Sequence, residues 1–139
     1  MYPHQELTHR IIAAALEVHK NLGPGLLEAV YLLCLEFEFE KAGLKYQKEL
    51  DIPITYKNKQ INHHFRIDFL VEDAIILELK SVETILLVHE HQLLTYLRLS
   101  GKQLGLLINF NVSMLKHGIK RRILSGAPYS LLHQEEKIG

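Results

Sequence analysis

The chain has 139 residues, 47% of them hydrophobic, and a mean hydropathy of +0.02. These values predict a single compact domain over residues 1–139 that is large enough to bury a core of its own. Sixteen basic and sixteen acidic residues leave no net charge at pH 7, which excludes the overall positive charge of a dedicated nucleic-acid-binding protein. Any contact with nucleic acid must therefore be local.

Cysteine content and hydropathy indicate the expected compartment. The one cysteine, Cys34, excludes an internal disulfide and a cysteine-based zinc site, which fits a reducing cytosol. No apolar segment approaches the roughly 20 residues of a membrane span, and the first six residues lack the basic and apolar regions of a signal peptide. We expect a cytoplasmic protein that does not enter a membrane.

Two helices are predicted at the start of the chain. Apolar residues recur at helical spacing over residues 4–22, and Gly23-Pro24-Gly25 ends this amphipathic helix. A second helix is predicted over residues 26–42, with Gly43 suited to the left-handed position that follows it. Apolar residues surround this second helix, so it needs more than one neighbour. We expect a homodimer unless the first helix supplies the second cover.

Glu28 lies in the first turn of the second helix, where the helix dipole favours an anion. It is either a simple first-turn charge or a ligand that faces a site elsewhere in the fold. Three short strands are predicted next, separated by turns, over residues 44–48, 52–56 and 61–65.

A buried hairpin is predicted after these strands. Residues 69–71 and 74–77 are apolar and rich in β-branched side chains, as in strands covered on both faces, and Glu72-Asp73 between them supplies turn chemistry. Three ionisable residues, Asp68, Glu78 and Lys80, flank these apolar segments. Charged groups so close to a buried hairpin need a physical explanation.

The length of the turn decides whether these charges meet. Side chains alternate along a strand, so Glu78 and Lys80 share one face. Asp68 lies opposite Glu78 only if the loop has three residues, Glu72 to Ala74, or if the strand contains a bulge. That register is the prediction we adopt.

Two adjacent carboxylates repel unless a cation lies between them, and oxygen ligands suit Mg²⁺ or Mn²⁺. Asp68 and Glu78 are therefore candidate metal ligands. In the alternative interpretation, Glu78 and Lys80 form a salt bridge on an edge strand, and Asp68 is a strand-end residue.

A third helix is predicted over residues 86–100, closed by Gly101. Its predicted buried side consists of four leucines, Leu86, Leu93, Leu94 and Leu97. His89, Gln92 and Tyr96 form a second, polar row that we expect to border the site.

A continuous apolar strand is predicted over residues 104–110, followed by a dense basic cluster over residues 116–122. The cluster, which includes Lys120, Arg121 and Arg122, is either a solvated surface or a phosphate contact. The polar residues 133–139 are predicted to fray.

Several short motifs occur in a fixed order along the chain: Gly25-Leu26-Leu27-Glu28-Ala29-Val30-Tyr31, Arg66-Ile67-Asp68, Glu78-Leu79-Lys80, Gln92-Leu93-Leu94-Thr95-Tyr96 and Gly105-Leu106-Leu107-Ile108-Asn109-Phe110. With these motifs the chain resembles the PD-(D/E)XK nuclease superfamily, and in particular its small GxxExxY proteins. One departure is Ile67, which stands where the superfamily motif has proline.

The resemblance implies a restriction-endonuclease-like α/β core, a mixed central sheet flanked by helices in the order ααβββ(β)αβ. It also implies metal-dependent hydrolysis of phosphodiester bonds in nucleic acid, with DNA favoured over RNA. Asp68, Glu78 and the Leu79 carbonyl would hold Mg²⁺ or Mn²⁺, and Glu28 would complete the site directly or through water. Lys80 would position the nucleophile or stabilise the transition state.

The same resemblance implies supporting roles around this centre. Gln92 and Tyr96 would support the site and the bound strand. The other candidates for support or nucleic-acid contact are Tyr31, His89, Lys120, Arg121 and Arg122. In the alternative function, the protein has the nuclease fold but binds nucleic acid or a protein partner without cutting. Zero net charge and a single basic cluster favour weak binding of nucleic acid or a partner that brings the substrate.

Overall fold

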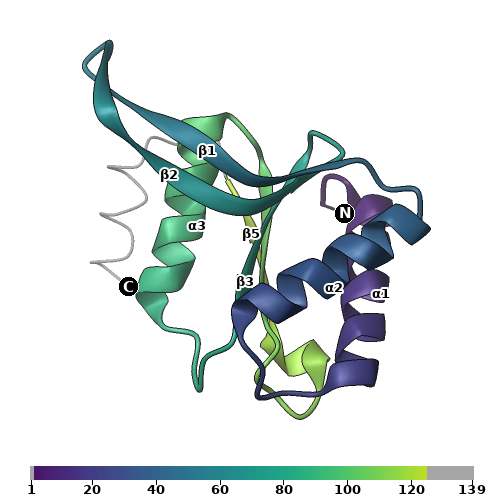
Figure 1. Cartoon of the computed structure of the whole chain (residues 1–139). Coiled ribbons are helices and arrows are strands. Elements are labelled where there is room, and N and C mark those ends of the chain that lie inside the picture. Colours follow the sequence, from purple (N-terminus) through teal and green to yellow (C-terminus); the bar gives the residue numbers. More distant parts are fainter. Residues whose placement is uncertain (1, 125–139) are drawn as a thin grey trace.

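The computed structural model describes residues 2–124 (Figure 1). The predicted tail over residues 133–139 lies outside this range. The elements are, in chain order, α1 (Gln5–Leu22), α2 (Glu28–Lys41), β1 (Tyr46–Tyr56), β2 (Lys59–Val71), β3 (Ile75–Lys80), α3 (Leu87–Ser100), β4 (Leu104–Asn109), the 3-10 helix η1 (Leu115–Gly118) and β5 (Ile119–Ile123).

The strands form one mixed sheet in the order β1-β2-β3-β4-β5 within the described part of the chain. β3 and β4 are parallel, and the other neighbouring strands are antiparallel. A parallel pair needs a crossover connection, which α3 supplies. Figure 1 shows α1 and α2 on one face of the sheet and α3 on the other. This mixed α/β architecture confirms the expected fold class.

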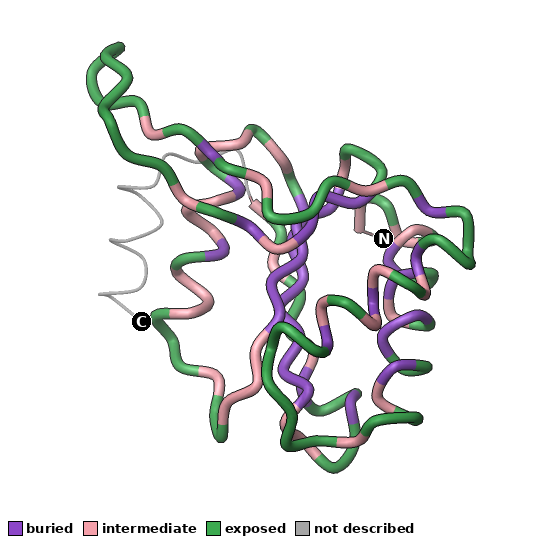
Figure 2. Tube along the Cα trace, viewed as in Figure 1, coloured by how far each residue is buried: buried purple, intermediate pink, exposed green. Residues whose placement is uncertain are grey.

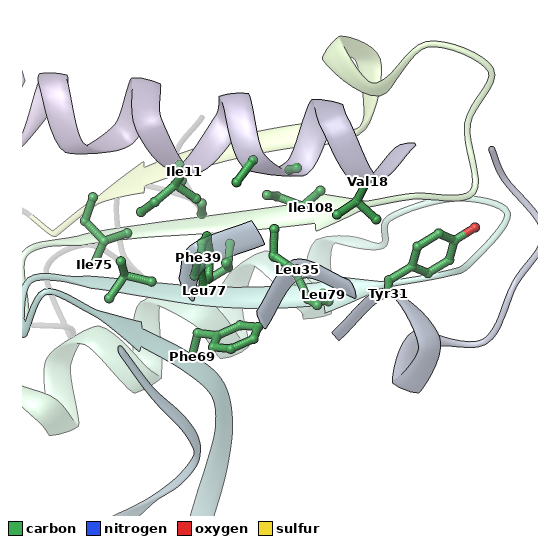
Figure 3. Packing of buried hydrophobic residues seen from close by; sticks show 14 of the residues in the cluster. Ile11, Val18, Tyr31, Leu35, Phe39, Phe69, Ile75, Leu77, Leu79 and Ile108 are labelled. Carbon is green, nitrogen blue, oxygen red and sulfur yellow. The ribbon is translucent and has the colours of Figure 1, made fainter. Parts of the chain in front are cut away.

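The core has one layer on each face of the sheet, and buried residues follow the central strands (Figure 2). The layer under α1 and α2 includes Ile11, Val18, Leu35, Phe39, Leu77 and Ile108 (Figure 3). The layer under α3 includes Ile67, Leu70, Ile76, Leu93, Leu97 and Leu107. No helix within residues 2–124 is both long enough and apolar enough to cross a bilayer.

The β2–β3 hairpin has the predicted register. Val71 pairs with Ile75, so three residues, Glu72 to Ala74, form the loop. Glu72 and Asp73 adopt the left-handed conformation, with φ of 51° and 54°. Phe69 pairs with Leu77, and the same register continued by one position brings Asp68 opposite Glu78, as expected.

The prediction of separate short strands before this hairpin was wrong. Residues 44–48 and 52–56 contribute to one strand, β1, and residues 61–65 are part of β2. Pro53 does not interrupt β1 because β1 is an edge strand, where a missing N–H costs no ladder bond. Strand β5 was not predicted, because four of the residues around it are basic and the pattern suggested a surface loop.

Helix α2 has two apolar sides with different environments. Tyr31, Leu35 and Phe39 are buried against the sheet and α1. The other side, which we call the α2 stripe, is exposed and consists of Val30, Leu33 and Phe37, together with Leu26 in the turn before the helix. The exposed fractions of Leu33 and Phe37 are 59% and 62%. The expectation that this helix needs more than one neighbour is met, because both the sheet and α1 cover its buried side, while the α2 stripe stays exposed within the described residues.

Helix α3 begins one residue later than predicted, and Leu86 is exposed instead of buried. Leu86 is the residue before the helix, and its backbone N–H donates to Nδ1 of His89 at 3.0 Å. Its side chain therefore leaves the sheet side of the helix, whereas Leu93 and Leu97 remain fully buried against β4 and β3.

Candidate metal centre

Asp68 and Glu78 are held together by hydrogen bonds that cross between β2 and β3. The backbone N–H of Asp68 donates to Oε1 of Glu78 at 3.1 Å, and the N–H of Leu79 donates to Oδ2 of Asp68 at 2.7 Å. Each bond uses one oxygen of its carboxylate, so the second oxygen of each can face a ligand. Only 8% of the Glu78 surface is exposed.

Burial and mutual repulsion make these two acids unusual. Burial, followed by the charge of Asp68, raises the pKa of Glu78 to about 8. Burial also raises the pKa of Asp68, and the Leu79 N–H partly opposes that shift. The positive charge of Lys80 lowers the pKa of both acids. The pair therefore holds a proton at neutral pH in metal-free protein, and a divalent cation would replace that proton.

The donor set fits a hard divalent cation. Within residues 2–124, no three or more Asp, Glu, His or Cys side chains lie close enough together to enclose a metal ion. Two carboxylates and the Leu79 carbonyl are an open set of oxygen ligands. Mg²⁺ is usually held by one or two carboxylates and keeps several of its waters, so this open set suits it.

Glu28 lies beside this pair at the start of α2. Its Oε2 accepts a hydrogen bond of 3.4 Å from the N–H of Ser81, the residue after β3. Glu28, Asp68 and Leu79 line one cavity of about 320 Å³. The charge of Glu28 also raises the pKa of Asp68 and Glu78. Glu28 therefore lines the cavity with Asp68, and its charge acts on both carboxylates.

Glu49 and Arg66 line the same cavity, and the sequence analysis missed both. Glu49 lies across from Asp68 in the β1–β2 pairing, and its charge contributes to the raised pKa of Asp68. Its φ of 51° is unusual for a non-glycine residue in a strand. The Arg66 guanidinium lies 3.9 Å from Glu49 and 3.1 Å from Asp51. Only the β1–β2 register brings Glu49 here, and no local motif marks it.

Lys80 is the last residue of β3 and aligns with Asn109 of β4. β3 is the central strand of the sheet, so a salt bridge between Glu78 and Lys80 on an edge strand is excluded. Within the described residues, the Lys80 ammonium forms no ion pair with Glu78. Its influence on the pKa of Glu78 and Asp68 nevertheless shows that its charge acts on the site.

The polar row of α3 divides into three different environments. Tyr96 is half-buried, and burial, followed by the charges of Glu78 and Asp68, raises the pKa of its hydroxyl. Its ring lies 5.1 Å from that of Phe65. His89 bonds to the backbone at the start of α3, and Gln92 is exposed. Tyr96 is therefore the member of the row whose pKa is raised by the two carboxylates.

Tyr31 is fully buried and cannot contact nucleic acid directly. Its hydroxyl donates to the Gly23 carbonyl at 2.6 Å and accepts from the Leu26 N–H at 3.2 Å, and its ring stacks on Phe110 at 4.4 Å. Figure 3 shows the hydroxyl at the end of the core layer. The Leu26 carbonyl in turn accepts from Ser81 Oγ at 2.5 Å. Tyr31 thus fixes the turn that positions Glu28.

The predicted basic cluster lies on β5, at the far edge of the sheet. The Arg121 guanidinium stacks 3.6 Å above the Tyr2 ring, and Arg122 forms an ion pair with Glu90 of α3. Lys120 is exposed and pairs with Leu107, which pairs with Glu78. Two strand spacings, about 10 Å, therefore separate Lys120 from Glu78 along one row.

Comparisons with known proteins identify the fold and the family. The crystal structure of SSO0001 is similar, with a TM-score of 0.56 and 19% sequence identity. The similarity covers 78% of this chain and 55% of that protein, so this chain spans about half of its length, and at this identity it shows the fold alone. A search of curated proteins gives no match. The family model of the PD-(D/E)XK nuclease superfamily matches residues 5–122, and the chain therefore belongs to that superfamily.

Proposed function

We propose that the protein is a Mg²⁺- or Mn²⁺-dependent nuclease that hydrolyses phosphodiester bonds, with DNA favoured over RNA. The observation that carries this proposal is the Asp68–Glu78 pair, in which Glu78 is buried and Asp68 is half-buried. Its two acids repel each other and are bonded to opposite strands of the central hairpin. Such a pair destabilises a fold unless a cation joins it, and perturbed acids of this kind cluster at functional sites.

Asp68, Glu78 and the Leu79 carbonyl would hold the ion, with Glu28 acting through a water. When bound there, the ion would lower the pKa of an attacking water and offset charge on the phosphate. Glu28 also has a positioning role, because its bond to the Ser81 N–H connects α2 to the end of β3. Glu49 pairs with Arg66 and adds a further negative charge on the opposite side of Asp68.

Lys80 supplies the positive charge of the proposed mechanism. Its ammonium would orient the nucleophile or stabilise the negative charge that develops on the phosphate. The influence of Lys80 on both acids supports this role, because it indicates that the charge lies near the reacting centre. The Tyr96 hydroxyl would support the site from α3, with Gln92 beside the entering strand.

The finer family assignment rests on three residues of the first motif. Gly25 has a left-handed φ of 95°, Glu28 faces the carboxylate pair, and Tyr31 bonds to both sides of the turn between them. Because each residue of the G-x-x-E-x-x-Y pattern has a distinct part in positioning the site, we propose that the protein is of the GxxExxY type. We further propose that residues 1–139 act as one domain in the cytoplasm.

The exposed α2 stripe supports the proposal of a protein partner in addition to the enzymatic function. Val30, Leu33 and Phe37 follow one another at helical spacing on α2, and Leu26 lies just before the helix. This pattern is typical of a helix that packs against another helix. We propose a second copy of the chain as that partner. A different protein that delivers the substrate, or a nuclease-fold protein that binds without cutting, are the alternatives.

A titration combined with a cleavage assay tests the nuclease proposal. Calorimetry with Mg²⁺ and Mn²⁺ should detect an ion that Asp68→Asn no longer binds. A panel of labelled single- and double-stranded DNA and RNA should then reveal metal-dependent cleavage by wild type and none by Asp68→Asn. If wild type binds the ion but cuts no substrate, the non-cutting alternative is correct.

A further inference from the structure

The β1–β2 hairpin extends beyond the sheet as an arm, defined here as residues 55–64. Every residue of the arm is exposed, and Figure 2 shows it as the projecting exposed segment of the molecule. The base of the hairpin, by contrast, packs on α3 through Ile52 and Phe65. A two-stranded hairpin without a packed face contributes little stability to a fold, so the arm needs another explanation.

The composition of the arm indicates the chemistry of its partner. The arm contains Lys57, Lys59, His63 and His64, together with amide and hydroxyl side chains, and it contains no Asp or Glu. All sixteen acidic residues of the chain therefore lie outside the arm. Lys57 and Lys59 therefore make the arm a local positive surface, and it is complementary to a polyanion.

The turn at the tip makes this composition more informative. Tyr56 pairs with Lys59, so Lys57 and Asn58 form a two-residue loop, with φ of 50° and 65°. Such loops favour Asn-Gly or Asp-Gly, because both central residues must adopt positive φ. A lysine occupies the first position here, and its Nζ lies 5.4 Å from the Tyr56 ring centre. Turn formation alone does not account for a lysine at this position.

The reach of the arm matches a nucleic acid that also enters the metal centre. Glu49 lies across from Asp68, and at about 3.3 Å per residue Lys57 lies roughly 25 Å further along β1. That distance corresponds to about seven base pairs of duplex DNA at 3.4 Å each. One duplex can therefore contact the carboxylate pair and the arm at the same time.

We propose that the arm inserts into the major groove of duplex DNA beside the cleavage position and contacts the phosphates that border the groove. The major groove of B-DNA admits a two-stranded β-ribbon, whereas the deep and narrow major groove of A-form RNA does not. This inference rests on the proposed nuclease function, because it takes the Asp68–Glu78 site as the place where the same duplex is cut.

The test measures DNA binding as a function of salt. Lys57→Gln/Lys59→Gln removes two charges from the arm. As a control, Lys41→Gln/Lys45→Gln removes two charges from exposed lysines, one at the end of α2 and one just before β1. All variants carry Lys80→Ala, and gels verify that the DNA stays intact in Mg²⁺. Fluorescence anisotropy then gives the affinity for labelled duplexes of about 24 and about 6 base pairs, since the shorter one cannot span the distance.

The arm variant should bind the long duplex several-fold more weakly. Its slope of log affinity against log salt should be smaller by about 1.8, because each lost phosphate contact removes about 0.9. The control should keep the slope, and the short duplex should not distinguish the variants. Three results would overturn the inference. The slopes of the arm variant and the control could be equal, the long duplex could fail to bind, or the arm variant could lose as much affinity for double-stranded RNA as for DNA.

The two proposals fail in different ways. Cleavage of the short duplex by the protein with Lys80 intact measures nuclease activity on a substrate that cannot reach the arm and the metal centre at once. If this cleavage occurs while the slopes are equal, the arm inference alone is wrong. If no substrate is cut while binding still depends on the arm, the nuclease proposal is wrong, and the arm is a DNA contact without a cleavage position beside it.

Discussion

Glu78 lies in the central strand beside a second acid, and the nearby ammonium of Lys80 offsets its raised pKa only in part. In metal-free protein the pair therefore keeps a proton that an exposed glutamate would lose near its ordinary pKa of 4.5. That proton and a divalent ion compete for the same oxygens. Stability, metal binding and catalysis should consequently depend on pH through one residue.

The stability of the metal-free protein should fall as pH rises from about 5 to about 8. The pKa of Glu78 is raised from 4.5 to about 8 in the folded protein, so between these values the folded state still binds a proton that the unfolded state has lost. The stability that this difference supplies decreases across the window and is lost once the folded state is deprotonated as well. Urea unfolding in EDTA at several pH values measures this. Glu78→Gln should show a shallower dependence, and an unchanged dependence would contradict the role given to Glu78.

Lys80→Ala and Glu78→Gln should separate catalysis from metal binding. Loss of the Lys80 charge should reduce cleavage by about 10²–10³ or more while Mg²⁺ still binds, because an electrostatic stabiliser is lost. Glu78→Gln should lose Mg²⁺ binding and cleavage together, with partial recovery at high metal concentration. Calorimetry and strand cleavage on both variants make the comparison.

Lys48→Ala provides the control for this pair, because Lys48 forms an exposed ion pair of 2.9 Å with Glu36, away from the cavity that Glu28, Asp68 and Leu79 line. It should change neither measurement. Equal cleavage by wild type and Lys80→Ala would remove the catalytic role of Lys80.

At the level of elements, the hairpin that carries the site could be predicted and the strand beside it could not. The β2–β3 hairpin followed from side-chain alternation and a three-residue loop, both of which are local. The position of Glu49 depends on a bulge between Pro53 and Thr55. Without this bulge, the loop at Lys57-Asn58 would bring Gln47 opposite Asp68. One irregular pairing therefore determines which side chain completes the cavity.

The start of α2 offers a test of positioning. Tyr31→Phe keeps the ring that stacks on Phe110 but removes the hydroxyl that bonds to Gly23 and Leu26. The free energy of unfolding should fall by about 1–3 kcal/mol, because two backbone groups lose a partner. Cleavage should fall further than stability explains, since the same turn positions Glu28.

Urea unfolding gives the stability loss, and cleavage well below the unfolding midpoint gives the activity loss. Tyr46→Phe is the matched control, because it also removes a hydrogen-bonded hydroxyl, here one that lies 2.9 Å from Oε2 of Glu36, and Tyr46 lies outside the turn that positions Glu28. It should lower stability without the additional loss of cleavage. Full activity of Tyr31→Phe at reduced stability would restrict Tyr31 to a packing role.

For the whole molecule, the α2 stripe predicts self-association. The protein should sediment as a dimer at micromolar concentration, because exposed apolar side chains at helical spacing gain free energy when they are buried. Phe37→Glu should produce a folded monomer, since Phe37 is already 62% exposed in one chain. Leu87→Glu is the control, because Leu87 is 65% exposed on α3 and lies outside the stripe. A wild-type monomer at micromolar concentration would exclude this dimer.

The short turn between β2 and β3 also has a consequence for the order of folding. Three residues separate these strands, whereas β3 and β4 pair across the connection that contains α3. Shorter loops close at a smaller entropic cost, so the hairpin that joins Asp68 and Glu78 should form before the parallel pairing. Repulsion between the two acids then acts on the first contacts of folding. In stopped-flow experiments, refolding in EDTA should slow as pH rises past about 8, and added Mg²⁺ should restore the rate. A refolding rate that depends on neither pH nor Mg²⁺ would show that this contact forms after the transition state of folding.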